Sequence, residues 1–148
     1  MTSRYLLDTS VLSALAPDKL DDGAVLRSWL VVTLPRLHLS TVTVFEITHG
    51  IEKLRGVGAS NRANANARWL DASLSLFDDR VLAMDTTVAR EAGRLADWAM
   101  SRGINPGAPD IMIAATAVAH DLTLLTYNMK RFAPLEIGAI NPAVELPR

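Results

Sequence analysis

Cysteine is absent from all 148 residues of this sequence. Its absence excludes disulfide bonds, zinc–thiolate sites and a cysteine nucleophile together, and it suits a reducing compartment. No apolar run approaches the ~18 residues that a transmembrane helix needs, so no membrane partner is predicted. The start of the chain also lacks the long apolar segment of a signal peptide. We therefore expect a cytoplasmic protein.

An excess of either charge is also missing, because 15 Lys and Arg side chains face 16 Asp and Glu side chains. A net charge of −1 is unusual for a nucleic-acid-binding protein. It excludes nothing, since binding depends on where charges lie and acids around a metal can mask a basic surface elsewhere. Arginine provides 12 of the basic residues and suits bidentate recognition of phosphate.

Several catalytic motifs are lacking as well. There is neither a phosphate-binding G-x-x-x-x-G-K-[ST] loop nor a G-x-S-x-G nucleophile turn. Internal repeats, low-complexity tracts and linkers are absent too, and the length suits one core. We therefore expect one domain over residues 1–148.

Short apolar runs alternate with segments of helical periodicity along the chain. We predict five strands, at Tyr5–Leu7, Leu37–Leu39, Val81–Met84, Leu122–Thr126 and Leu135–Ile140. We predict helices at Ser10–Leu15, Gly23–Leu34, from caps at Ser40, Thr41 or Thr43 to Leu54, from the turn after Arg55 to about Leu76, at Thr86–Ser101, and over the small-residue stretch after Asp110. This alternation predicts an α/β fold whose mainly parallel sheet has helices on both faces.

Polar side chains gather at the predicted strand ends. Asp8 follows the first strand, Glu46 lies early in the helix after the second, and Asp110 begins the helix that leads to the fourth. Asn128 follows that fourth strand. Because active sites of such sheets lie beyond the carboxyl ends of the strands, we expect these four side chains to converge.

The apolar surroundings of these acids point to a cation. Buried carboxylates are costly unless they are neutralised or bound to a metal, and oxygen-only ligands suit Mg²⁺, or alternatively Mn²⁺. Capping is the competing explanation, with Asp8 or Ser10 as an N-cap and Asp110 second in its helix behind Pro109. Glu46, within an apolar stretch, gains nothing from capping.

Four stretches, "YLLDTSVLSAL", "LSTVTVFEITHGI", "PDIMIAATAVAHDLTLLTYN" and "AINP", together resemble the PIN-domain ribonucleases, and in particular the VapC and FitB toxins of bacterial toxin–antitoxin pairs. The resemblance implies a single PIN domain with a three-layer α/β/α sandwich. It also implies metal-dependent RNA cleavage, a homodimer and a cognate antitoxin that blocks the site. The family's acidic metal-binding positions fall on Asp8, Glu46 and Asp110, and Ser10 matches a small polar position that orients the first acid.

The fourth strand departs from the family pattern. The family often ends it with Thr-Arg-Asp or Thr-Arg-Asn, whereas this chain has Tyr127 and Asn128 after the threonine. Asparagine supplies no charge, so one tightly bound ion is expected and the number of metals stays open.

We hypothesise a Mg²⁺-dependent endoribonuclease toxin. Two alternatives remain open: a nuclease of this fold that acts on DNA, and a noncatalytic module that binds RNA or a partner protein. Which RNA is cleaved is not encoded in any motif.

A basic segment between residues 53 and 70 contains no acid. Its cations are Lys53, Arg55, Arg62 and Arg68. They are candidates for contact with RNA backbone or with an acidic antitoxin segment, and a solvated helical arm is the alternative.

Overall fold

Five short strands form one parallel sheet at the centre of the computed structural model, which describes residues 3–19 and 24–147. The strands are β1 (Tyr5–Leu7), β2 (Leu37–Ser40), β3 (Val81–Leu82), β4 (Thr123–Leu125) and β5 (Ala139–Ile140). Their spatial order is β3-β2-β1-β4-β5, and every neighbouring pair is parallel. The prediction of a parallel sheet of five strands is therefore confirmed.

Seven α-helices and three short 3-10 turns connect these strands within the described residues. The α-helices are α1 (Thr9–Ser13), α2 (Ala24–Thr33), α3 (Thr41–Gly56), α4 (Ser60–Phe77), α5 (Thr86–Ser101), α6 (Ala108–Ala119) and α7 (Met129–Phe132). The 3-10 turns are Leu34–Arg36, Asp78–Arg80 and Ala133–Leu135. Ser40 caps α3, because its Oγ accepts the Val42 N–H at 3.0 Å. The predicted first residue of the second helix, Gly23, lies outside the described residues.

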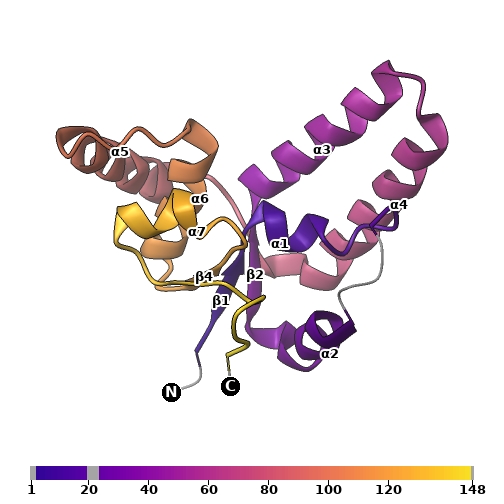
Figure 1. Cartoon of the computed structure of the whole chain (residues 1–148), viewed down its shortest axis with the longest axis horizontal. Coiled ribbons are helices and arrows are strands. Elements are labelled where there is room, and N and C mark those ends of the chain that lie inside the picture. Colours follow the sequence, from indigo (N-terminus) through magenta and orange to yellow (C-terminus); the bar gives the residue numbers. More distant parts are fainter. Residues whose placement is uncertain (1–2, 20–23, 148) are drawn as a thin grey trace.

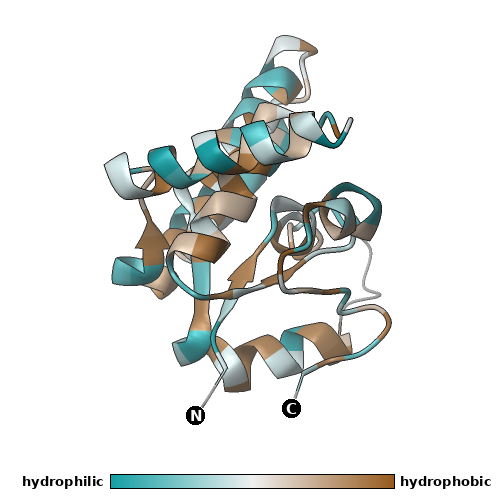
Figure 2. Cartoon of the chain, turned by 90° about the vertical axis from the view of Figure 1, so that its left-hand side faces the viewer, coloured by the Kyte–Doolittle hydropathy of each residue, from teal (hydrophilic) through white to brown (hydrophobic). Residues whose placement is uncertain are grey.

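Helices cover both faces of the sheet, so the predicted three layers are confirmed. Alternate side chains of β1 point to opposite faces: Leu7 packs in one core with α2 and α4, and Leu6 packs in the other with α5 and α6. Figure 1 shows α1–α4 on one side of the strands and α5–α7 on the other. Figure 2 shows brown, hydrophobic strands between helices of mixed colour.

Two edge strands are shorter than predicted. The fifth was expected from Leu135, but Pro134 lies in a 3-10 turn and Glu136 adopts a left-handed φ of 57°, so β5 begins only at Ala139. The third ends at Leu82, because the Met84 N–H bonds to the Thr41 hydroxyl at 3.1 Å. Both strands are shortened by contacts of side chains or turns, and an apolar run in the sequence does not reveal such contacts.

The strand order places a switch point beside the central strand. From β1 the chain adds β2 and β3 on one side, and β4 and β5 pair on the other. Neighbouring crossovers therefore diverge at the carboxyl ends of β1 and β4, which leaves a crevice where ligands bind in such folds. Asp8 stands at this point, since its N–H donates to Leu125 O at 2.9 Å. None of the described helices combines the length and hydropathy needed to cross a membrane.

Candidate active site

Asp8 is the most deeply buried acid of the site, with only 4% of its surface exposed. It occupies the N-cap position of α1, but its side chain makes no capping hydrogen bond. Instead, its Oδ2 accepts hydrogen bonds from Ser10 Oγ at 2.7 Å and from Thr126 Oγ1 at 2.8 Å. The capping explanation of the Asp8 side chain is therefore wrong: two hydroxyls clamp one oxygen of the carboxylate.

Both clamping hydroxyls are themselves held in place by the loop that follows β4. Ser10 Oγ accepts the Tyr127 N–H at 3.2 Å, and Thr126 Oγ1 accepts the Asn128 N–H at 2.9 Å. Each hydroxyl thus uses its proton on the acid and its lone pair on the backbone. The orientation of Asp8 depends on the junction between β1 and β4.

Glu46 lies half-buried in the second turn of α3. Thr9 Oγ1 donates to Glu46 Oε1 at 2.7 Å and lies 3.0 Å from the hydroxyl of fully buried Thr43. This network again engages one carboxylate oxygen. No hydrogen bond to the other, Oε2, is found among the described residues, so it is available to another ligand.

Asp110 is the third residue of α6, after Ala108 and Pro109, one position later than the capping alternative assumed. Its side chain is 15% exposed, and its Oδ1 lies 3.7 Å from a guanidinium nitrogen of Arg131. Burial raises the pKa of Asp110 above its usual value. The positive charge of Arg131 opposes this rise in pKa, and the negative charge of Asp8 adds to it. Asp8 and Asp110 therefore lie close enough to interact electrostatically.

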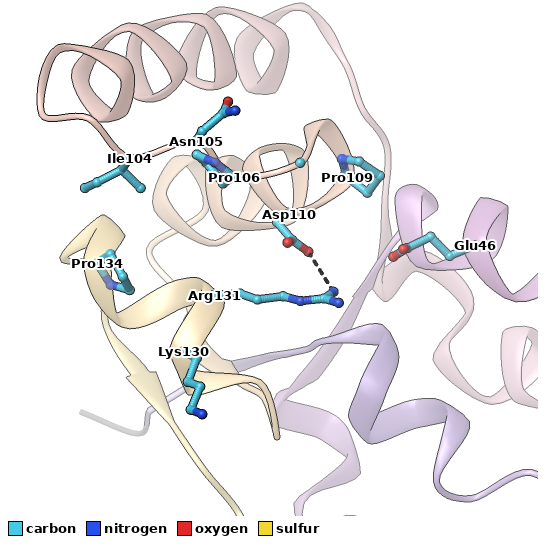
Figure 3. Close-up of a pocket in the computed structure, with 10 residues that line it drawn as sticks. Glu46, Ile104, Asn105, Pro106, Pro109, Asp110, Lys130, Arg131 and Pro134 are labelled. Atoms are coloured by element: carbon cyan, nitrogen blue, oxygen red, sulfur yellow. Dashed lines mark ion pairs between the residues drawn. The ribbon is translucent and has the colours of Figure 1, made fainter.

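A cavity of about 490 Å³ joins two of the acids. Among the residues that line it are Glu46, Asp110, Lys130 and Arg131. In Figure 3, Glu46 and Asp110 face one another across the cavity, and Arg131 reaches from α7 toward the space between them. The cavity therefore offers both anionic and cationic groups to a ligand.

The chemistry of this donor set fits a hard divalent cation. All the candidate ligands are oxygens, and each of the two clamped carboxylates has one oxygen with no partner among the described residues. The three side chains are nevertheless spread apart. Across residues 3–19 and 24–147, no three His, Cys, Asp or Glu side chains stand close enough to hold a metal ion as they lie. A bound ion would therefore have to draw the carboxylates together.

Three contributors were not identified from the sequence: Thr9, Thr126 and Arg131. Thr126 ends the predicted fourth strand, and a polar residue at that position was the available signal. Arg131 lies on α7, a four-residue helix with no periodicity long enough to predict it. Asn128 was predicted at the site, and its backbone supports Thr126 there; its half-buried side chain makes no capping bond.

The predicted basic segment forms the hairpin of α3 and α4, which projects from the rest of the molecule (Figure 1). All four cations are exposed. Arg55 contacts Glu52 at 3.5 Å and Asn64 at 2.6 Å. Arg62 binds Asp18 at 2.8 Å, and this hydrogen bond lowers the pKa of Asp18. Two of the four cations are thus engaged with the protein itself.

The chain is similar over most of its length to known proteins. The model of the family described as PIN domain matches residues 5–134. Toxin FitB of Neisseria gonorrhoeae is 30% identical over 138 residues, covering 93% of this chain and 96% of that protein. VapC ribonuclease Y4jK of Sinorhizobium fredii is 33% identical over 139 residues, with the same shares covered.

Solved structures agree with these relatives. The crystal structure of FitAcB from Neisseria gonorrhoeae has a TM-score of 0.79 at 32% identity, covering 96% of this chain and 99% of that chain. A structure described as FitAB bound to a DNA fragment has a TM-score of 0.80 at 29% identity, covering 97% and 98% of the two chains. The predicted family is therefore confirmed.

Proposed function

Because the chain belongs to the PIN domain family, we propose that it is a divalent-metal-dependent endoribonuclease and the toxin of a toxin–antitoxin pair. We further propose that it is a homodimer in solution and that one PIN domain spans residues 1–148. The relatives named as ribonuclease and toxin support the activity. The observation that carries the proposal is the position of Asp8 at the switch point of the sheet, together with Glu46 and Asp110 lining one cavity and the charge of Asp8 acting on Asp110.

Asp8, Glu46 and Asp110 would hold the ion, with Mg²⁺ as the expected metal and Mn²⁺ as its substitute. When bound, the ion supplies Lewis-acid charge and lowers the pKa of an attacking water. Ser10 and Thr126 orient Asp8 by donating to its Oδ2. Thr9 holds Glu46 by Oε1, which leaves Oε2 either to complete the ion's shell through water or to accept a proton from water.

The direct test is RNA cleavage with added Mg²⁺ or Mn²⁺. Asp8→Asn and Asp110→Asn remove one ligand charge each and should lower the rate at least about a hundredfold, because such ions contribute several kcal/mol to transition-state stabilisation. Asp97→Asn, an exposed acid on α5, is the matched control and should cleave like the wild type.

Each alternative has its own result. Equal activity in wild type, Asp8→Asn and Asp110→Asn would refute the metal site. Cleavage of DNA but not RNA would reassign the substrate, and RNA binding without cleavage in any metal would leave a noncatalytic binding module.

A second cavity is the candidate binding site for the proposed antitoxin partner. An apolar cavity of about 300 Å³ lies between α2 and α4, and Val31 and Leu76 on its rim are 75% and 62% exposed. Exposed apolar side chains around a cavity are typical of a protein-binding surface. Solved relatives described as toxin–antitoxin complexes support an antitoxin as the occupant.

A further inference from the structure

Arg131 is placed against the acids by its neighbours on α7. The helix starts directly after the β4 loop, with the Arg131 N–H donating to Asn128 O at 3.0 Å. Phe132 is fully buried and anchors α7 to the core below α6. Arg131 is consequently turned outward, with its side chain 62% exposed and its guanidinium 3.7 Å from Asp110. In Figure 3, Lys130 points away from the same carboxylates.

The guanidinium occupies a position where positive charge is needed. Glu46 and Asp110 line one cavity, the charge of Asp8 acts on Asp110, and Asn128 brings no charge of either sign. Among the described residues, the 3.7 Å contact of Arg131 is the shortest ion pair to any of the three. Without a metal, Arg131 therefore reduces the repulsion among them.

This ion pair is weak enough to be exchanged. Exposed pairs of this kind shift an equilibrium by less than about fivefold, because water screens them and a long side chain must be ordered. A divalent cation carries twice the charge and is held by several oxygens at once. Such an ion is therefore the stronger competitor for Asp110. Arg131 lines the same cavity as Asp110.

We propose that Arg131 is an exchangeable counter-cation of the site: it holds Asp110 in the metal-free protein, yields Asp110 to the divalent ion, and then binds the scissile phosphate of the RNA. The proposal rests on the proposed ribonuclease function. A guanidinium presents a planar pair of N–H donors that matches two phosphate oxygens. Arg131 thereby supplies part of the positive charge that a second metal ion would bring, and the uncharged Asn128 is a poor ligand for such an ion.

A purely structural ion pair between α6 and α7 is the competing role, and metal titration separates the two. Mn²⁺ binding is measured without RNA by electron paramagnetic resonance for wild type, Arg131→Gln, Arg131→Lys and Arg94→Gln. Arg94 is the matched control, because it is 67% exposed and pairs with Glu91 at 3.1 Å on α5. Arg131→Gln should bind Mn²⁺ roughly twofold to fivefold more tightly, since the competitor is gone. Arg131→Lys and Arg94→Gln should stay near wild type.

Single-turnover RNA cleavage at saturating Mn²⁺ tests the second step. Arg131→Gln should cleave about a hundredfold more slowly, which is the usual cost of losing one donor to transition-state charge. Arg131→Lys should cleave faster than Arg131→Gln but more slowly than wild type. Arg94→Gln should cleave at the wild-type rate. Tighter metal binding with slower cleavage is a combination that a structural role does not produce, because a damaged site loses both.

The outcomes separate this inference from the function on which it rests. Wild-type Mn²⁺ affinity in Arg131→Gln, or a cleavage rate within twofold of wild type, overturns the role of Arg131 while the ribonuclease stands. A wild-type protein that cleaves no RNA under any metal overturns the proposed function, and the phosphate-binding step with it.

Discussion

At the scale of single residues, Asp8 shows how a site acid differs from a helix cap. Its position before α1 is that of an N-cap, yet its carboxylate accepts no backbone N–H of the helix and bonds instead to the hydroxyls of Ser10 and Thr126. Such hydroxyls fix a ligand's orientation in the way that outer-shell partners of metal sites do. The uncommitted Oδ1 is the oxygen left for a cation.

Thr126→Val tests this clamp directly. The change keeps nearly the same shape but removes the hydroxyl that donates to Asp8 and accepts from Asn128. We expect Mn²⁺ affinity to fall roughly tenfold to a hundredfold, because Asp8 is no longer oriented. We also expect the free energy of unfolding in urea to fall by about 1–3 kcal/mol, since two buried polar groups lose a partner.

Thr116→Val is the matched control for that change. Thr116 is equally buried, and its hydroxyl bonds to Met112 O at 2.8 Å inside α6. It should cost stability and leave metal affinity unchanged. Wild-type Mn²⁺ affinity in Thr126→Val would show that the clamp does not orient the ligand.

At the scale of elements, the hairpin of α3 and α4 carries charge beyond the sheet. Arg55 and Arg62 have partners on the protein, whereas Lys53 and Arg68 form no ion pair among the described residues. Cations without local partners are the better candidates for phosphate contact, because no internal pair must break first.

The double change Lys53→Gln with Arg68→Gln should weaken RNA binding and flatten its salt dependence. Each lost phosphate contact lowers the slope of log K against log salt by about 0.7 for a single strand. Fluorescence anisotropy at several salt concentrations with catalytically inactive Asp8→Asn protein measures this slope. A paired change on α5, Arg90→Gln with Arg94→Gln, removes the same charge elsewhere. If log K for RNA binding falls with log salt at the same slope in both double variants, Lys53 and Arg68 do not contact RNA.

The elements themselves were largely predictable. Apolar periodicity and capping residues are local, so β1, α3 and α5 lie close to where the pattern put them. The edges of the sheet were not, because β3 ends early at a side-chain hydrogen bond and β5 begins late after a 3-10 turn. Short helices such as α7 contain too few residues for any period to show.

At the scale of the whole molecule, the cavity proposed for catalysis and the cavity proposed for partner binding are formed by different helices. The first is lined by Glu46 of α3 and by residues of α6 and α7, among them Asp110, and the second lies between α2 and α4 and is apolar. An antitoxin held at the second cavity is adjacent to α1, which follows Asp8. A partner bound there would therefore act on Asp8 through α1.

Val31→Asp should weaken antitoxin binding at least about tenfold, because a charge would be buried in an apolar contact. The measurement is surface plasmon resonance against a purified candidate antitoxin. Val25→Asp is the matched control on the same helix, since Val25 is 73% exposed and does not line the cavity. RNA cleavage by the free toxin should be unchanged in both variants.

Two outcomes would contradict that placement. Equal antitoxin affinity in Val31→Asp and Val25→Asp would place the partner elsewhere. A loss of dimer mass in light scattering for Val31→Asp alone would assign this surface to a second copy of the chain.

The sequence by itself determined which chemistry is available. Acids after predicted strands, the lack of cysteine and the apolar surroundings of Glu46 are local facts, and they predict an oxygen-ligand site at one edge of a parallel sheet. Only the tertiary structure decided which groups complete that site. Thr126 meets Asp8 across 118 positions, and Arg131 meets Asp110 across the α6–α7 packing. Such contacts follow from strand order and helix docking, which no short stretch of sequence contains.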